Sequence, residues 1–264
     1  MINLRYYQHE TINKVIEAYK NGVNRQLVVL PTGAGKTIIF STLAKLFKQR
    51  TLILVHRDEL VRQTVEKLNE VWPESDIGIV KAKQNEYQKQ VVIASIQTLS
   101  QPERLKQVLN ENFTMMIIDE AHHAVSKTDK SIIRCLGFDK DDQNKLLLGV
   151  TATPIRGDGT NLREVFQKAV MEISLLTLIR ANYLADLIGI SITTENNIQN
   201  IKMRGGDFNR IHLAESINTK ERNQLIVDSY IKYARGRKAA AFTVDIQHAE
   251  DLAALFRENG IKAK

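Results

Sequence analysis

Cysteine is nearly absent from this chain of 264 residues, and long apolar runs are missing altogether. Because Cys135 is the one cysteine, an internal disulfide is impossible, no zinc-ligand spacing exists, and we expect a small core residue there. No apolar run approaches the roughly 18 residues that span a bilayer, and the polar, aromatic N-terminus lacks the apolar core of a secretory signal. We therefore expect a cytoplasmic protein without a membrane partner.

Proline and glycine are also too few for a disordered chain. Only 4 prolines and 13 glycines interrupt a sequence that is 43% hydrophobic and 25% charged, which is typical of a globular protein. Acidic residues are outnumbered, and the net charge is +7. A basic protein attracts polyanions such as nucleic acid, but charge alone does not establish that partner. The motifs must decide.

Short β-branched apolar runs alternate with amphipathic stretches along the first part of the chain. The runs are predicted to be buried strands at 26–30, 51–55, 91–94, 115–118 and 146–150. Residues 38–48 and 59–71 carry apolar side chains at helical spacing. The alternation predicts an α/β fold in which helices cover a parallel sheet on both faces.

The pattern loosens after this region. A polar stretch at 193–210 is typical of a loop or linker. A new unit follows, in which we expect helices at 219–234 and 249–258 and a buried strand at 238–244.

A glycine-rich turn joins the first predicted strand to the first predicted helix. Its residues are Pro31, Thr32, Gly33, Ala34, Gly35, Lys36 and Thr37. Glycines let backbone N–H groups point inward, and the helix N-terminus adds partial positive charge, so the turn predicts a cradle for nucleotide phosphates. We expect Lys36 to neutralise the β- and γ-phosphates and the Thr37 hydroxyl to hold Mg²⁺. The strict pattern would place its first glycine where this chain has Leu30.

Two carboxylates follow the predicted strand at 115–118. Asp119 and Glu120 therefore lie at the carboxyl end of a parallel strand, where ligands bind in open sheets. We expect Asp119 to bind the Mg²⁺ that bridges the phosphates of ATP, and Glu120 to orient and deprotonate the attacking water. Such a pair alone is usually solvated loop, so its function depends on the phosphate loop.

The phosphate loop and the Asp119–His122 stretch resemble motifs I and II of the DEAD/DEAH-box class of superfamily 2 helicases. The resemblance implies a RecA-like P-loop NTPase domain that uses ATP and Mg²⁺. Residues 151–154 resemble motif III, and the resemblance implies that the hydroxyls of Thr151 and Thr153 link the phosphate state to nucleic-acid engagement. His122 is then implied to bridge the ATP site to motif III.

Other stretches match the same family in its order. Residues 54–63 resemble motif Ia and residues 95–99 resemble motif Ib. Loop hydroxyls, amides and helix N-termini can hold a sugar-phosphate backbone without reading bases. The resemblance implies nucleic-acid contacts by His56, Arg57, Gln63, Ser95 and Thr98.

The N-terminus resembles the family's adenine-recognition element at residues 4–8. Gln8 corresponds to the amide that reads the base edge, which suits a group with a donor and an acceptor in one plane. Arg5 is implied to stack or pair nearby. Tyr6 and Tyr7 are as readily explained by plain helix packing.

The last part of the chain is similar to the motif IV region that opens a second motor domain. Residues 153–159 and the pair at 207–208 resemble the RadD-like and XPB/Res-type branch, which acts on DNA, so we expect DNA rather than RNA. The implied organisation is an ATP-binding RecA-like domain, a linker and an incomplete second RecA-like domain, at 1–190, 191–218 and 219–264.

Nothing after Val244 resembles motifs V and VI, whose arginines stabilise charge on the transferred phosphoryl group. We therefore expect slow hydrolysis and no translocation by this chain alone, with a partner or a longer product supplying the missing motor half. Three functions stay open: an ATP-dependent helicase or translocase, a nucleotide-binding regulatory module that hydrolyses little, and the motor subunit of a restriction or defence complex.

Overall fold

The computed structural model describes residues 2–153, 162–193, 203–204 and 207–264. The chain divides into two compact units, Met1–Leu187 and Ile188–Lys264. None of the helices in the described ranges combines the length and the apolar composition that crossing a bilayer requires.

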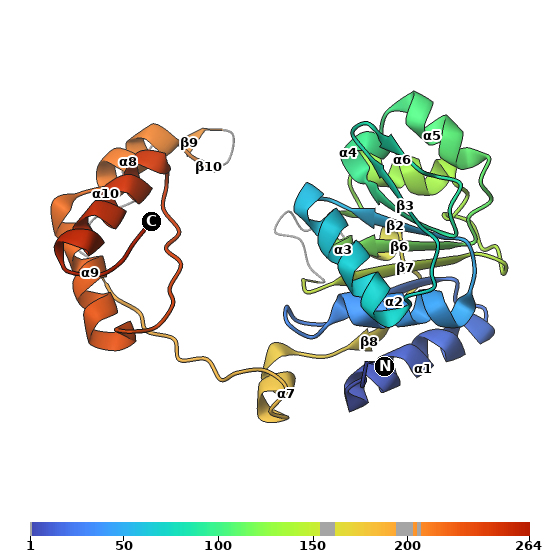
Figure 1. Cartoon of the computed structure of the whole chain (residues 1–264), viewed down its shortest axis with the longest axis horizontal. Coiled ribbons are helices and arrows are strands. Elements are labelled where there is room, and N and C mark those ends of the chain that lie inside the picture. The colour runs from blue at the N-terminus through green and yellow to red at the C-terminus, as the bar shows by residue number, and fades with distance from the viewer. Residues whose placement is uncertain (1, 154–161, 194–202, 205–206) are drawn as a thin grey trace. The chain divides into compact units, whose positions relative to one another are not determined.

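Strands and helices alternate in the first unit (Figure 1). Its strands are β1 (Arg25–Val29), β2 (Thr51–Val55), β3 (Ile77–Lys81), β4 (Gln84–Asn85), β5 (Val91–Ser95), β6 (Met115–Asp119), β7 (Leu146–Thr151) and β8 (Lys168–Glu172). Its helices are α1 (Tyr6–Lys20), α2 (Lys36–Phe47), α3 (Asp58–Val71), α4 (Ile96–Leu99), α5 (Pro102–Leu109), α6 (Lys127–Cys135) and α7 (Leu175–Arg180), with 3₁₀ turns η1 (Ala121–His123) and η2 (Leu162–Glu164). The five strands and two helices predicted for this region are confirmed.

The strands form one sheet in the order β4-β3-β5-β2-β6-β7-β1-β8. Its pairings are parallel except that between β3 and β4, which is antiparallel. The predicted parallel sheet is therefore confirmed. Sequence patterning missed β3, β4 and β8 because these strands lie near or at the sheet's edges, where half-exposed positions break up the apolar runs.

Two hydrophobic cores cover the two faces of the sheet. Successive strand residues alternate between them, so Leu52 and Leu54 face one core while Ile53 and Val55 face the other. Helices α1, α2 and α3 pack on one face, and α4, α5 and α6 lie on the other (Figure 1). Cys135 was expected in a core but is exposed, since it ends α6 on the outer side of that helix.

The second unit is mainly helical in its described residues. It contains β9 (Met203–Arg204), β10 (Asp207–Phe208), α8 (Arg210–Ile217), α9 (Lys220–Ala234) and α10 (Ile246–Glu258). The two predicted helices are confirmed, and Thr219 and Asp245 cap them through their side chains. Within the predicted linker at 191–218 lie α8 and the short β9–β10 pair.

The buried strand predicted at 238–244 is wrong. These residues form no strand, and Phe242 is 100% exposed. A strand needs a neighbour for its backbone hydrogen bonds, and the strands described in this unit, β9 and β10, pair only with each other. Some of the residues singled out in the sequence lie outside the described residues. They are Pro154 at the end of the motif III stretch, residues 155–159, and the glycines at 205–206.

The close approach of η1 to the sheet depends on Gly149 in β7. A Cβ atom there would lie 2.4 Å from Phe166 Cζ and 2.8 Å from Ala121 Cβ. We therefore expect Gly149→Ala to lower the free energy of unfolding by about 1–3 kcal/mol through overpacking, measured by denaturant unfolding. Gly189→Ala, where a Cβ would meet no atom within 4 Å, is the control. Equal stability of the two variants would contradict this account of the packing.

Candidate functional site

The carboxyl ends of five neighbouring parallel strands carry most of the predicted site residues. In sheet order these strands are β5, β2, β6, β7 and β1. Val55 lies opposite Ser95, Asp119 opposite Val150, and Thr151 opposite Val29. The register therefore brings the beginnings of the predicted phosphate loop, the acidic pair and motifs Ia, Ib and III to one edge of the sheet.

The predicted phosphate loop leaves β1 and ends where α2 begins at Lys36. Gly33 (φ 84°) and Gly35 (φ 76°) both have left-handed backbone conformations, which glycine adopts without steric cost. A Cβ on Gly35 would also lie 2.6 Å from Gln8 Nε2. The loop therefore requires glycine at position 35 for two independent reasons.

The N-terminal segment holds the loop through one carbonyl. The Ala34 oxygen accepts hydrogen bonds from Tyr7 Oη (2.7 Å) and Gln8 Nε2 (3.0 Å). Gln8 Oε1 in turn accepts from the Arg5 backbone N–H (2.9 Å). An amide nitrogen carries two N–H groups, so adenine recognition by Gln8 stays a prediction alongside this structural contact.

Sequence reasoning missed Tyr183, which follows α7 and lies beside the same segment. Its ring meets that of Tyr7 edge to face with centroids 4.9 Å apart, and the Arg5 guanidinium lies 5.7 Å from its centroid. Arg5 Nη1 also donates to Tyr7 Oη at 3.2 Å. No motif marks Tyr183, because only the fold brings it to residues near the N-terminus.

Lys36 and Asp119 face the same site. Burial and the Glu120 carboxylate raise the pKa of Asp119 to about 6, while the Glu120 backbone N–H and the charge of Lys36 act in the opposite direction. Lys36 Nζ donates to the Leu30 carbonyl at 3.4 Å. A carboxylate that is only 8% exposed and has a raised pKa is one that a bound cation would stabilise.

The oxygen donors at this edge suit a Mg²⁺ ion that is held partly by a nucleotide. They are too few to hold a metal ion by protein side chains alone. Thr37, half-buried in the first turn of α2, and Asp119 supply hydroxyl and carboxylate oxygens. Within the described part of the chain, no group of three or more His, Cys, Asp or Glu side chains could hold a metal ion. Mg²⁺ is usually held by one or two carboxylates together with substrate phosphates, so these donors suit an ion that arrives with a nucleotide.

The Thr151 hydroxyl connects the acidic pair to the end of β7. It donates to the Thr153 carbonyl (3.2 Å), accepts from the Thr153 backbone N–H (3.1 Å) and lies 3.2 Å from His122 Nδ1. The Thr151 hydroxyl therefore contacts both the backbone of Thr153 and the imidazole of His122. His122 Nδ1 also lies 3.4 Å from Glu120 Oε2, so the bridge predicted for His122 has a geometric basis.

The residues predicted to contact nucleic acid fall into two groups. Arg57, at the N-cap of α3, and Gln63, within it, are exposed. Ser95 and Thr98 are buried and bonded to each other at 3.0 Å, and the Ser95 hydroxyl caps α4. The described side chains of Ser95 and Thr98 therefore shape the motif Ib turn, and nucleic-acid contact stays a prediction for all four.

His56 is partly buried between two other elements. Its ring centroid lies 4.3 Å from that of His123, and its carbonyl accepts from Gln97 Nε2 of α4 at 2.7 Å. The sequence motifs gave no indication of these contacts of Gln97 and His123. The pair of adjacent histidines at 122 and 123 was the sequence feature that could have pointed to His123.

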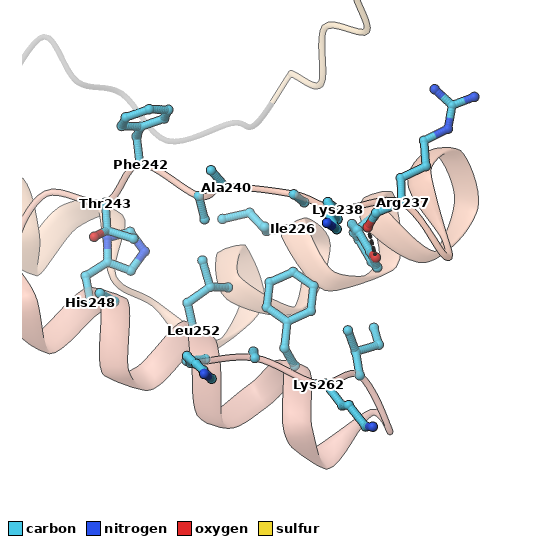
Figure 2. A pocket seen from close by; sticks show the side chains of 18 residues that line it. Ile226, Arg237, Lys238, Ala240, Phe242, Thr243, His248, Leu252 and Lys262 are labelled. Carbon is cyan, nitrogen blue, oxygen red and sulfur yellow. Dashed lines mark hydrogen bonds between the residues drawn. The ribbon is translucent and has the colours of Figure 1, made fainter. Parts of the chain in front are cut away.

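A separate groove of about 980 Å³ lies in the second unit (Figure 2). The extended stretch at 238–243 and helices α9 and α10 form its walls, and Ile226 and Leu252 line it. No carboxylate is among its lining residues. The groove is therefore unsuited to Mg²⁺ and has an apolar character.

Comparisons with known proteins show the family to which this sequence is similar. The sequence profile of the family described as type III restriction enzyme, res subunit (ResIII), matches residues 1–156. IRC3 of Saccharomyces cerevisiae, named as a candidate ATP-dependent helicase, is 32% identical over 98% of this chain and 39% of its own length. The DNA 3′-5′ translocase XPB2 of Sulfurisphaera tokodaii is 28% identical over 74% of this chain and 42% of its own length.

A solved structure shares the fold. It is a nuclease-deletion mutant of the type ISP restriction-modification enzyme LlaGI in complex with a DNA substrate mimic, with a TM-score of 0.54 and 13% identity over 97% of this chain and 26% of that one. The chain thus spans less than half the length of each of these three proteins.

The environment of His56 predicts a low pKa. Burial, and then the neighbouring His123 and His122, lower the pKa of His56 to about 4 from its ordinary 6.5. The folded protein therefore binds fewer protons than the unfolded chain in this interval, so stability should fall as the pH drops from about 6.5 towards 4. Imidazole NMR should show His56 neutral at pH 5.5, and His56→Phe should flatten the loss of stability. A His56 midpoint near 6.5 would contradict the burial argument.

Proposed function

Because this chain belongs to the ResIII family and is of the superfamily 2 helicase type, we propose that it binds and hydrolyses Mg²⁺-ATP as part of a motor acting on nucleic acid. The observation that carries the proposal is the meeting of three strand ends, where Lys36, Asp119 and Thr151 share one edge of the sheet. The phosphate loop lies beside them and is held open by glycines.

Each residue at this edge has a definite task in the proposed reaction. Backbone N–H groups of the loop and the N-terminus of α2 bind the phosphates. Lys36 exchanges its contact with the Leu30 carbonyl for the β- and γ-phosphates. Glu120 orients the attacking water and accepts its proton. When bound, Mg²⁺ supplies positive charge to the phosphate oxygens, and Thr37 and Asp119 would hold it.

The link from hydrolysis to nucleic acid runs through the end of β7. His122 lies within contact distance of both Glu120 and Thr151. A shift of the Glu120 carboxylate would therefore move the His122 ring and change its contact with the Thr151 hydroxyl. Thr151 in turn fixes the backbone of Thr153. Movement at the phosphates therefore has a short route of side-chain contacts from Glu120 through His122 to Thr151.

DNA is the proposed nucleic acid. XPB2 is named as a DNA translocase, and the LlaGI structure contains a DNA substrate mimic. In this chain, Arg57 and Gln63 are exposed on α3, which starts at the same edge of the sheet, and the net charge is +7. Such groups can track a sugar-phosphate backbone without reading bases.

The second unit is proposed to be the beginning of a second RecA-like domain. Its extended stretch at 238–243 lies along the apolar groove, and Phe242 is exposed (Figure 2). This is the arrangement expected of a strand that has no neighbouring strand among the described residues. Pairing with further strands would cover the groove and satisfy the backbone of this stretch. The family description also favours a second candidate role, as the motor subunit of a restriction complex.

Removing the charge of Lys36 should weaken nucleotide binding. A hydrogen bond to a charged group contributes about 1.5–3 kcal/mol, so Lys36→Ala should bind Mg²⁺-ATP roughly 10-fold to 100-fold less tightly in calorimetry. Lys20→Ala, at the exposed end of α1, should bind as the wild type does. Tight ATP binding by Lys36→Ala would refute the proposed site.

Replacing Glu120 tests the hydrolytic step separately from binding. Glu120→Gln should retain ATP binding but lose phosphate release by about 100-fold or more, because general bases contribute on that order. Double-stranded DNA should stimulate phosphate release by the wild type and not by the variant. Release that is equal with and without DNA or RNA would favour a nucleotide-binding regulatory module over a motor.

A further inference from the structure

Three imidazole rings form a continuous stack beside the proposed ATP site. The centroids of His122 and His123 are 4.1 Å apart with planes tilted by 43°, and those of His123 and His56 are 4.3 Å apart with planes tilted by 44°. His122 of motif II and the adjacent His123 are thereby joined to His56, the first residue after β2. The stack connects two loops that are distant in sequence.

Each end of the stack meets a functional or structural anchor. At one end, His122 Nδ1 lies 3.2 Å from Thr151 Oγ1 and 3.4 Å from Glu120 Oε2. At the other end, His56 Nε2 lies 3.7 Å from Asp129 Oδ1. The rings therefore fill the space between the proposed catalytic carboxylate and a buried carboxylate on α6.

The far anchor is held firmly. Asp129 is 1% exposed, and its backbone N–H donates to the hydroxyl of Ser126, the N-cap of α6. Ser126 itself donates its backbone N–H to the His123 carbonyl at 2.8 Å. His123 is thus tied to α6 through its backbone and to His56 through its ring.

The same contact reaches the proposed nucleic-acid surface. His56 is followed by exposed Arg57 at the start of α3, and its carbonyl is held by Gln97 of α4, the motif Ib helix. A displacement of the His56 ring therefore bears on both proposed nucleic-acid loops. Side chains in close contact have low compressibility, so a small shift of one ring displaces the ring beside it.

We propose that His123 is a positioning residue that couples the ATP site to the nucleic-acid loops by packing between His122 and His56. The inference rests on the proposed function of the site and adds a second route, which leaves His122 through His123 instead of through Thr151. The proposal assigns the coupling to the ring of His123, because its contacts with His122 and His56 are both ring to ring.

The test separates the ring from the residue's other properties. His123→Ala removes the ring, His123→Phe keeps an aromatic ring of similar thickness, and Lys127→Ala on exposed α6 surface is the matched control. Three quantities are measured for each: affinity for Mg²⁺ with a non-hydrolysable ATP analogue, the nucleotide-induced change in the His56 imidazole NMR signals, and the affinity for a DNA duplex with and without nucleotide.

We expect all variants to bind nucleotide within about threefold of the wild type. In three proteins, the wild type and the His123→Phe and Lys127→Ala variants, nucleotide should change the chemical shifts of the His56 imidazole. In the same three proteins, nucleotide should change the affinity for DNA by about fivefold or more. In His123→Ala the His56 response should vanish and the change in DNA affinity should fall below twofold. Thermal unfolding of each variant checks that the fold persists. If His123→Ala unfolds, the test uses His123→Phe alone. Loss of coupling in His123→Phe then overturns the proposal.

Other outcomes are equally decisive. A full response in His123→Ala overturns the inference. Nucleotide binding by the wild type without any movement of the His56 signals also overturns it, while leaving the ATP site intact. Absence of nucleotide binding by the wild type instead refutes the proposed function from which the inference starts.

Discussion

The parallel register of three strands is the constraint on which the site depends. Asp119 at the end of β6 lies opposite Val150, and Thr151 lies opposite Val29, two residues before the phosphate loop begins at Pro31. The backbone N–H of Leu30 continues this pairing to the Thr151 carbonyl at 2.9 Å. A shift of one residue in either pairing would turn each strand-end side chain to the opposite face, and Lys36 and Asp119 would no longer act on one another.

Around this register, the site combines rigid backbone with groups that gain from a ligand. The loop is fixed by glycine conformations and by two hydrogen bonds to the Ala34 carbonyl. Glu120 adopts a left-handed conformation (φ 52°, ψ 51°), which is uncommon for a residue with a side chain. Asp119 is buried with a raised pKa, so a bound cation would stabilise its carboxylate.

Local pattern was enough to predict the central strands, because each depends on consecutive residues, and the glycine-rich turn and the acidic pair lie at strand ends as that pattern predicts. It failed where the cause lies outside the segment. The stretch at 238–244 has the composition of a strand, but strand formation depends on a neighbour that the described chain does not provide. Tyr183 and the stacking of His123 on His56 arise only when distant segments meet. The buried positions of Ser95 and Thr98 likewise follow from packing of α4, which motif resemblance does not report.

The central claim is that Lys36 and Asp119 act on one magnesium-bound triphosphate. A crystal structure of this chain with Mg²⁺ and a non-hydrolysable ATP analogue tests it most directly. The account predicts β- and γ-phosphates within hydrogen-bond distance of Lys36 Nζ and the loop N–H groups, and Mg²⁺ bound to the Asp119 carboxylate directly or through one water. Phosphates bound away from the loop, or an Asp119 carboxylate turned away from the metal and its waters, would contradict it.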